Sequence, residues 1–285
     1  MFIRKKYDVE VAFIEGYATR IVSGSNNIKS KKYAWVHVDF STTPWTDIAY
    51  RNFNEEKQCY TIFDNIFCVS NGVKERFQEK YGVTNCTTQY NPIDENEIIK
   101  KSTEFNVDKD ANLQLITLGR LVEQKGYDRL LNVVKRIKEE GIRNFNIWIL
   151  GDGEKKEEYS SFIKENNLQS LVKLLGFQNN PYPYIYNSDA FICSSRSEGF
   201  STVATEALIL EKPIFTVECT GMRELFGENE CGLIVENTDN ELYNLIKSLI
   251  TNHENMKKYK TGILKQKQNF LLDLRIKEID KIFDL

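Results

Sequence analysis

The second half of the chain alternates short apolar runs with longer amphipathic stretches. Between the first two runs, Tyr127, Leu130, Leu131, Val134 and Ile137 recur at the spacing of one helix face. Strands that alternate with helices predict a parallel sheet with right-handed crossovers and helices on both faces. Such a sheet binds ligands at the carboxyl ends of its strands. The predicted strands are residues 113–118, 146–150, 172–175, 190–193, 214–217 and 233–235.

The first hundred residues predict a smaller α/β unit. Apolar runs at 9–14, 33–38 and 66–70 are typical of strands. A helix through Val73 and Tyr81 follows the third run. We therefore expect a second parallel sheet with few strands.

A polar segment at 94–112 shows no firm apolar period and predicts the boundary between the two units. Apolar residues recur again in the lysine-rich tail, which predicts one or two amphipathic helices. We therefore divide the chain into residues 1–108, 109–262 and a C-terminal helix at 263–285.

Composition excludes several classes of protein. The net charge of −3 gives no case for nucleic-acid binding, and the two histidines exclude a histidine-rich metal site. The six cysteines form no Cys-x-x-Cys pair, which favours buried free thiols in a reducing compartment. No apolar run is long enough for a membrane span, and the basic start lacks the apolar core of a signal peptide. We expect a cytoplasmic protein.

Two glutamates flank the predicted strand-to-helix turn after residue 193. Glu198 lies in the turn beside Gly199, and Glu206 lies eight positions later in the helix. A helix start offers free N–H groups and a positive dipole, which bind phosphate. Carboxylates on either side accept hydrogen bonds from hydroxyls, so the pattern fits a nucleotide sugar. Two ordinary helix-associated carboxylates remain the alternative.

Two cations follow the first strand of the second half. Arg120 and Lys125 lie on the loop 119–126, at the ligand-binding edge of the predicted sheet. Arginine grips phosphate with two parallel hydrogen bonds, and lysine supplies a compact charge. The pair suits a pyrophosphate, although surface charge on a connecting loop is the alternative.

Short motifs follow one another in order along this half: Gly119-Arg120-Leu121-Val122-x-x-Lys125-Gly126, Gly151-Asp152-Gly153, Glu198-Gly199-Phe200, Glu206-Ala207-Leu208 and Lys212-Pro213-Ile214. The series closely resembles the donor-binding domain of glycosyltransferase family 4. Members of that family are retaining transferases with the GT-B architecture, in which two Rossmann-like domains face each other. The resemblance runs from about residue 113 to residue 250 and extends more weakly upstream.

The resemblance implies a role for each matching residue. Arg120 and Lys125 bind the donor diphosphate, Glu198 binds the transferred sugar and Glu206 binds the ribose. The backbone of Phe200, Ser201 and Thr202 holds the distal phosphate, and His37 faces the sugar near the bond that breaks. The implied catalytic set is His37, Arg120, Lys125 and Glu198, and the implied donor-binding set is Gly119, Gly199, Phe200, Ser201, Thr202 and Glu206.

The resemblance also implies the reaction. A sugar moves from a nucleotide sugar, with UDP-hexose or UDP-N-acetylhexosamine favoured, to a growing lipid-linked glycan of a capsule, lipopolysaccharide or similar polymer. We expect no cofactor and no metal, because Arg120 and Lys125 can neutralise the leaving diphosphate. A structural hydrogen bond is the alternative role for His37.

The first domain is shorter than in typical family members, which keeps a second interpretation open. The chain could be a nucleotide-sugar-binding fragment without catalysis, or one completed by a partner chain. A GT-B-like sugar-nucleotide epimerase is a third interpretation, and it needs acid and base groups beyond this set. Lysines of the first domain, including Lys29, Lys31 and Lys32, could contact anionic lipid at the inner face of a membrane or could be solvated charge.

Overall fold

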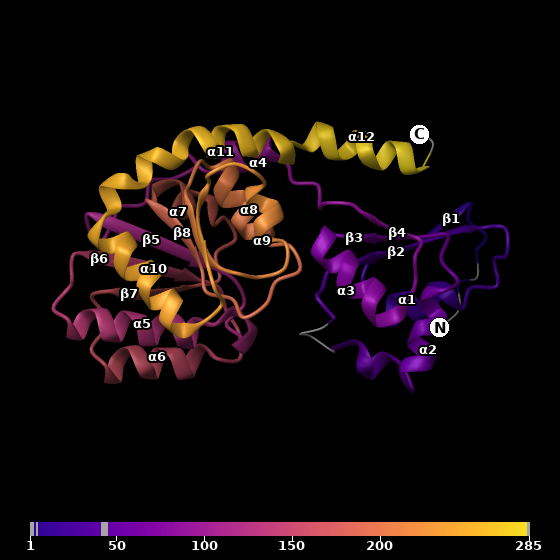
Figure 1. Ribbon diagram of the computed structural model, residues 1–285, viewed down its shortest axis with the longest axis horizontal. Helices are drawn as coiled ribbons and strands as arrows, with labels where there is room; N and C mark the ends of the chain where they lie inside the picture. The colour runs from indigo at the N-terminus through magenta and orange to yellow at the C-terminus, as the bar shows by residue number, and fades with distance from the viewer. Residues whose placement is uncertain (1–2, 4, 41–44, 284–285) are drawn as a thin grey trace. The chain divides into compact units, whose positions relative to one another are not determined.

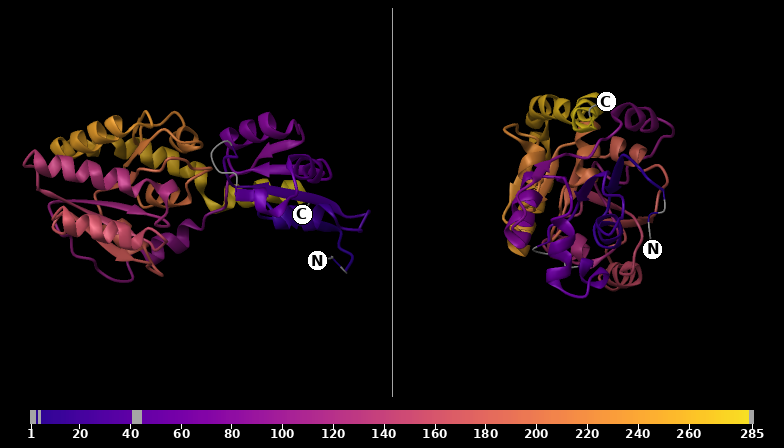
Figure 2. Two further views of the ribbon diagram at one scale, coloured as in Figure 1. Left: turned by 90° about the horizontal axis from the view of Figure 1, so that it is seen from below. Right: turned by 90° about the vertical axis from the view of Figure 1, so that its right-hand side faces the viewer.

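The computed structural model describes residues 3, 5–40 and 45–283, and the chain forms two compact units (Figures 1 and 2). Unit 1 comprises Met1–Asn91, Glu198–Phe200 and Glu278–Leu285. Unit 2 comprises Pro92–Ser197 and Ser201–Lys277.

Unit 1 contains a parallel sheet of four strands in the order β1-β2-β3-β4. The predicted strands at 9–14, 33–38 and 66–70 are present with ends displaced by a few residues. Strand β4 was not predicted, because its residues do not form an apolar run. The elements are β1 (Val9–Ala12), α1 (Tyr17–Ser23), β2 (Lys31–Val36), η1 (Trp45–Ala49), α2 (Phe53–Tyr60), β3 (Asn65–Cys68), α3 (Asn71–Tyr81) and β4 (Cys86–Thr88).

Aromatic rings fill the core of unit 1. Tyr60, Phe77 and Tyr81 are fully buried, and the Tyr60 ring meets Phe77 edge-on at 4.8 Å between centroids. Ser70 caps α3 by accepting a hydrogen bond from the Val73 N–H, and Gly82 ends the helix in the left-handed conformation. These signals produce the helix that the sequence predicts through Val73 and Tyr81.

Unit 2 contains a parallel sheet of six strands in the order β10-β9-β8-β5-β6-β7. All six predicted strands are confirmed. Ala190–Cys193 and Ile214–Val217 have the predicted bounds, because polar residues or a proline border each run. The strands are β5 (Leu113–Leu118), β6 (Phe145–Leu150), β7 (Val172–Gly176), β8 (Ala190–Cys193), β9 (Ile214–Val217) and β10 (Gly232–Val235).

Helices cover both faces of the second sheet, as an all-parallel sheet requires (Figure 1). Helix α5 packs against α6 and α10, and α8 packs against β8 and β9. The helices are α4 (Glu95–Lys101), η2 (Glu123–Lys125), α5 (Tyr127–Glu139), α6 (Lys156–Glu165), α7 (Tyr182–Asn187), α8 (Thr202–Ile209), α9 (Met222–Phe226), α10 (Asp239–Thr251), η3 (His253–Tyr259), α11 (Lys260–Gln266), η4 (Lys267–Phe270) and α12 (Leu272–Phe283).

The segment that we interpreted as a boundary contains α4. Asp94 caps this helix, Ile98 is buried, and the helix packs against α7 and α8. Residues 92–108 therefore belong to unit 2, which differs from the division at residue 108. One buried side chain in a short helix is too weak a period to recognise in the sequence.

The order of strands creates a switch point between β5 and β8. The chain passes from β5 outward through β6 to β7, then returns to β8 on the other side and continues outward to β10. The loops that leave β5 and β8 diverge at their carboxyl ends, which is where open α/β sheets bind ligands.

Candidate functional site

The loops after β5 and β8 are hydrogen-bonded to each other. The Ser194 hydroxyl donates to the Lys125 carbonyl at 3.0 Å, and the Arg196 N–H donates to the Gln124 carbonyl at 2.8 Å. The Gln124 side chain donates to the Ser197 carbonyl at 3.0 Å. These bonds hold the two segments that the sequence singled out side by side in unit 2.

Glycines allow the loops to approach closely. Gly126 has φ +64°, and a Cβ built on it would lie 2.2 Å from the Ser194 carbonyl oxygen. Gly151, after β6, has φ +140°, and its Cβ would lie 1.9 Å from the Gly119 carbonyl oxygen. Only glycine fits these contacts, so the Gly119 and Gly151 motifs have a packing function.

The cations of the site differ in their partners. Arg196 is neutralised by Asp128 through two hydrogen bonds of 2.7 and 2.6 Å, which raise the pKa of the guanidinium. Arg120 is exposed, and no carboxylate of the described residues pairs with it. The Lys125 chain lies over Gly119, with its Cε 3.2 Å from a Cβ built there. Arg120 is thus available to an anion.

Helix α8 begins at Thr202, within the stretch where the sequence predicts a helix start. Ser201 is its N-cap and accepts a hydrogen bond from the Ala204 N–H. The first-turn N–H groups of Thr202 and Val203 have no acceptor within the helix. This start provides the oriented donors and the positive dipole that hold phosphate.

Glu206 lies one turn into α8 and is half-buried. Burial raises the pKa of its carboxyl to about 7, and the Tyr182 hydroxyl, which donates to Oε1 at 3.4 Å, acts in the opposite direction. A carboxylate that lacks water gains most from a ligand that donates hydrogen bonds. Vicinal hydroxyls of a ribose offer two such donors.

Arg129 and Asn237 form a hydrogen-bonded centre that sequence analysis did not predict. Arg129 is buried and donates to Asn237 and Asp239, each at 2.6 Å. The Asn237 amide donates to the carbonyls of Arg196 and Glu218 at 3.1 and 2.9 Å. One side chain therefore ties the β8 loop to the β9 loop. Its partners lie far apart in the sequence, so no local spacing identifies it.

His37 lies at the end of β2 in unit 1. Glu15, a buried residue that sequence analysis missed, accepts hydrogen bonds from the N–H groups of His37 and Val38. Burial lowers the pKa of the His37 imidazole, and the Glu15 carboxylate, 3.9 Å from Nδ1, acts in the opposite direction. The Phe13 ring meets the imidazole edge-on at 5.2 Å. The imidazole is therefore favoured in its neutral form.

The predicted site residues fall into two groups. Unit 2 contains Gly119, Arg120, Lys125, Ser201, Thr202 and Glu206, whereas His37, Glu198, Gly199 and Phe200 are grouped with unit 1.

No cluster of three or more histidine, cysteine, aspartate or glutamate side chains suited to a metal ion occurs among the described residues. An Asp-x-Asp triplet, typical of metal-dependent transferases, is present at 108–110. It precedes β5, at the opposite edge of the sheet from the site loops, and Asp110 is bonded to Lys173 and Trp148. In the described part of the chain, no helix combines the length and apolarity that a bilayer crossing requires.

The chain resembles proteins of known or assigned activity. It is 33% identical over 229 residues to the N-acetylgalactosamine-N,N'-diacetylbacillosaminyl-diphospho-undecaprenol 4-alpha-N-acetylgalactosaminyltransferase of Campylobacter jejuni, covering 77% of this chain and 61% of the relative. The chain thus spans about three fifths of the length of that protein.

Solved structures share the fold at low sequence identity. HepE of Anabaena, in complex with UDP and glucose, superposes with a TM-score of 0.80 at 18% identity, covering 98% of this chain and 78% of that one. A TarM variant of S. aureus, in a complex that includes UDP, gives 0.72 at 18% identity, with 92% and 52% covered. The expected α/β fold of the GT-B type, with two parallel sheets, is confirmed. The model of the glycosyl transferases group 1 family matches residues 97–266, and the chain belongs to that family.

Proposed function

We propose that the chain is a retaining glycosyltransferase of the family 4 type that uses a UDP-sugar as donor. The observation that carries this proposal is that hydrogen bonds join the loop after β5, which contains Arg120 and Lys125, to the loop after β8, which leads to the start of α8. Departure of a nucleoside diphosphate builds negative charge on its oxygens, and preorganised cations and N–H groups stabilise that charge. The proposed mechanism does not use a metal ion.

Each proposed role follows from the chemistry of the side chain. Arg120 and Lys125 bind the diphosphate, the α8 start holds the distal phosphate, and Glu206 accepts hydrogen bonds from the ribose. Glu198 binds hydroxyls of the transferred sugar, and neutral His37 hydrogen-bonds to that sugar near its anomeric carbon.

The proposed reaction needs no nucleophile on the protein. The bond from the anomeric carbon to the diphosphate oxygen breaks, and its electron pair stays on that oxygen. The acceptor hydroxyl oxygen bonds to the carbon from the same face, and its proton passes to the departing phosphate oxygen. Configuration is thereby retained.

The proposed acceptor is a lipid-linked glycan of a bacterial surface polymer. This proposal is supported by the name of the Campylobacter relative, which contains diphospho-undecaprenol, and by the lipopolysaccharide core transferases of Rhizobium meliloti among the relatives. Incubation of the whole chain with UDP-sugars and lipid-linked acceptors, followed by UDP release, tests it. Release no greater than from Arg120→Ala would contradict the proposal.

A second candidate is a nucleotide-sugar-binding chain that needs a partner for turnover. The edge strand β1 favours it, because Val9 and Val11 are 37% and 40% exposed and its outer edge pairs with no other strand of the described residues. It predicts UDP binding by calorimetry without turnover. Turnover by the isolated chain would remove this candidate.

Contact with a membrane surface is a further part of the proposal. Lys29 and Lys31 are exposed, whereas Lys32 is buried beside Glu10 at 3.8 Å and is not available to lipid. We expect co-sedimentation with anionic vesicles that weakens in Lys29→Gln. Equal binding to neutral and anionic vesicles would contradict this contact.

A further inference from the structure

A cavity of about 1270 Å³ lies in unit 2 away from the donor loops. Asn112, Asp189 and Pro213 line it, and they immediately precede β5, β8 and β9. The donor loops follow the carboxyl ends of β5 and β8, so the cavity lies at the opposite edge of the same sheet. It is therefore a separate site.

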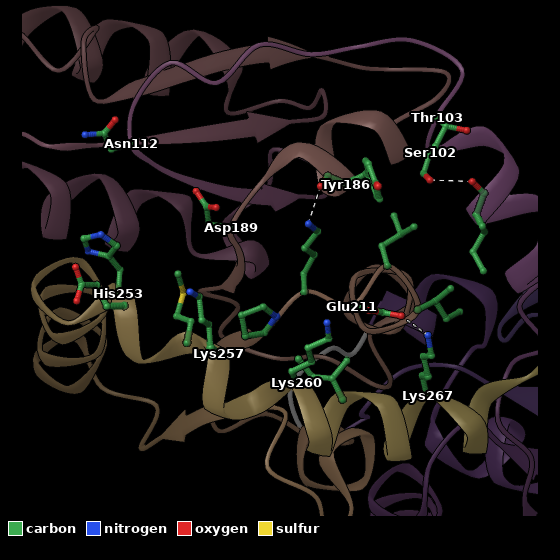
Figure 3. A pocket seen from close by; sticks show the side chains of 18 residues that line it. Ser102, Thr103, Asn112, Tyr186, Asp189, Glu211, His253, Lys257, Lys260 and Lys267 are labelled. Carbon is green, nitrogen blue, oxygen red and sulfur yellow. Dashed lines mark hydrogen bonds and ion pairs between the residues drawn. The ribbon is translucent and has the colours of Figure 1, made fainter.

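Lysines from two directions line this cavity. Figure 3 shows His253, Lys257 and Lys260 projecting from the C-terminal helical segment toward the cavity, across from Asp189. Lys212 enters from the start of β9. Its ammonium group donates to the Tyr186 carbonyl at 2.6 Å.

Three carboxylates line the cavity, and two of them are neutralised by ion pairs with lysines. Asp189 pairs with Lys109 at 2.6 Å, and Glu211 pairs with Lys267 at 2.6 Å. Among the described residues, no carboxylate lies within ion-pairing distance of Lys212, Lys257 or Lys260. The exposed Glu254 is the remaining acidic group of the lining. The cavity thus has an excess of positive charge.

Lys212 is a lysine of this lining whose ammonium group has a carbonyl partner, Tyr186, but no carboxylate within ion-pairing distance among the described residues. It is half-buried, and loss of water lowers the pKa of its ammonium group to about 8, with Lys109 acting in the same direction and Asp189 against it. A desolvated cation without a carboxylate is stabilised by an incoming anion.

Apolar side chains form another part of the lining, beside polar ones such as Ser102 and Asn112. Ile209, Leu210 and Ile263 are nearly fully buried and line the cavity together with Ile99, Pro213 and Met256. A phosphate ion would occupy a small fraction of the space, since organic ligands fill pockets of about 300–1,000 Å³. Charge and apolar surface together fit one class of molecule.

We propose that this cavity binds an organic phosphate, with Lys212, Lys257 and Lys260 on the phosphate and the apolar portion against Ile99 and Met256, which are exposed and half-buried, respectively. The occupant is thus a phosphate ester with a hydrocarbon body, which farnesyl phosphate represents. The site is independent of the donor site, and the two can fail separately.

Isothermal titration of the whole chain with farnesyl phosphate tests the proposal. Farnesol lacks the charge and glucose 1-phosphate lacks the hydrocarbon, so we expect each to bind at least about tenfold more weakly. Glucose 1-phosphate binding as tightly as farnesyl phosphate would show that the apolar surface does not contribute. Absence of farnesyl phosphate binding would overturn the site.

Substitutions of lining lysines test whether farnesyl phosphate binds in this cavity. Lys212→Gln and the exposed Lys257→Gln should each weaken farnesyl phosphate binding about tenfold, whereas Lys164→Gln on exposed α6 should not. Lys257→Gln alters only a surface side chain, so it tests the site even where Lys212→Gln fails to fold. Saturating UDP should leave the affinity unchanged. Displacement by UDP would place the ligand at the donor loops and contradict the proposal.

Discussion

Arg120 illustrates how much of the site resides in single side chains. Its guanidinium is exposed and has no carboxylate partner among the described residues, whereas the nearby Arg196 is held by Asp128. The sequence predicted Arg120 as a site residue because it follows a predicted strand. It could not distinguish a free guanidinium from a paired one, because the partner comes from another element.

Removal of Arg120 should abolish most activity without unfolding the protein. We expect Arg120→Ala to lower kcat/KM for the donor by about 10²–10³-fold, because a preorganised donor to the leaving diphosphate is lost. The melting temperature should change little, since the side chain is exposed. Arg143→Ala is the matched control, because Arg143 is also exposed but precedes β6 at the other edge of the sheet. Equal losses in both variants would contradict the assignment.

Glu206 should make stability depend on pH. Its carboxyl has a pKa of about 7 in the folded chain against an ordinary 4.5, so the folded state holds a proton that the unfolded state releases. Stability from this group is present below pH 4.5 and is lost as pH rises through 7, by about 3 kcal/mol in total. Urea denaturation across this range should show the decline in the native chain and a smaller one in Glu206→Gln. Glu165→Gln, at an exposed position of α6, should leave the decline unchanged.

The same carboxyl should couple ribose binding to pH. A diol donates hydrogen bonds to the carboxylate but gains less from the protonated acid. Uridine, which has no phosphate to titrate, should therefore bind more tightly at about pH 8 than at about pH 6. Glu206→Gln should remove this dependence. An unchanged dependence in the variant would place the ribose elsewhere.

At the scale of elements, the close packing of the loops after β5 and β8 requires glycine, and the reason for this requirement is visible only in the structure. Gly126 and Gly141 both have positive φ, +64° and +86°. A Cβ at Gly126 would meet the Ser194 carbonyl, whereas one at Gly141 would meet nothing within 4 Å. The two positions therefore separate backbone strain from loop packing.

Gly126→Ala should be much more destabilising than Gly141→Ala. We expect about 1 kcal/mol from backbone strain at Gly141 and at least about 3 kcal/mol at Gly126, where the β8 loop must also move. Urea denaturation measures both, and UDP titration should show weaker binding only for Gly126→Ala. Similar costs at the two positions would contradict the close packing of the loops.

The Arg129 and Asn237 centre should control the β8 and β9 loops together. Asn237→Ala leaves the carbonyls of Arg196 and Glu218 without a donor, so we expect a loss of about 2 kcal/mol in stability and weaker UDP binding. Asn244→Ala, at an exposed position of α10, is the matched control and should change neither. Unchanged UDP affinity in a destabilised Asn237→Ala would limit this residue to a structural role.

The pattern of the sequence predicts elements well where burial is complete. Strands β8 and β9 are buried at every position, and their bounds were predicted correctly. Strand β4 has no fully buried residue, and α4 has one, so neither produces a recognisable period. Elements that pack through one or two side chains are determined by tertiary contacts, which a local pattern does not contain.

At the scale of the whole molecule, strand order determines which loops meet. The sequence predicted that the loops after β5 and β8 lie at carboxyl ends, but nothing local shows that β8 returns beside β5. The same order places the large lysine-lined cavity at the opposite edge of the sheet, where the sequence predicted no site. Residues that only the strand order brings together cannot be identified from local sequence motifs.

Net charge argues that any attraction for a nucleotide is local. The chain carries −3 overall, so its long-range field does not favour an anion. Arg120, Lys125 and the α8 start must supply the positive charge for the diphosphate. We therefore expect the Kd of UDP by calorimetry to differ by less than about threefold between EDTA and saturating Mg²⁺. In Arg120→Ala, where the local charge is reduced, Mg²⁺ should restore part of the lost affinity. An increase of tenfold or more with Mg²⁺ in the native chain would mean that a metal ion, rather than these side chains, neutralises the diphosphate.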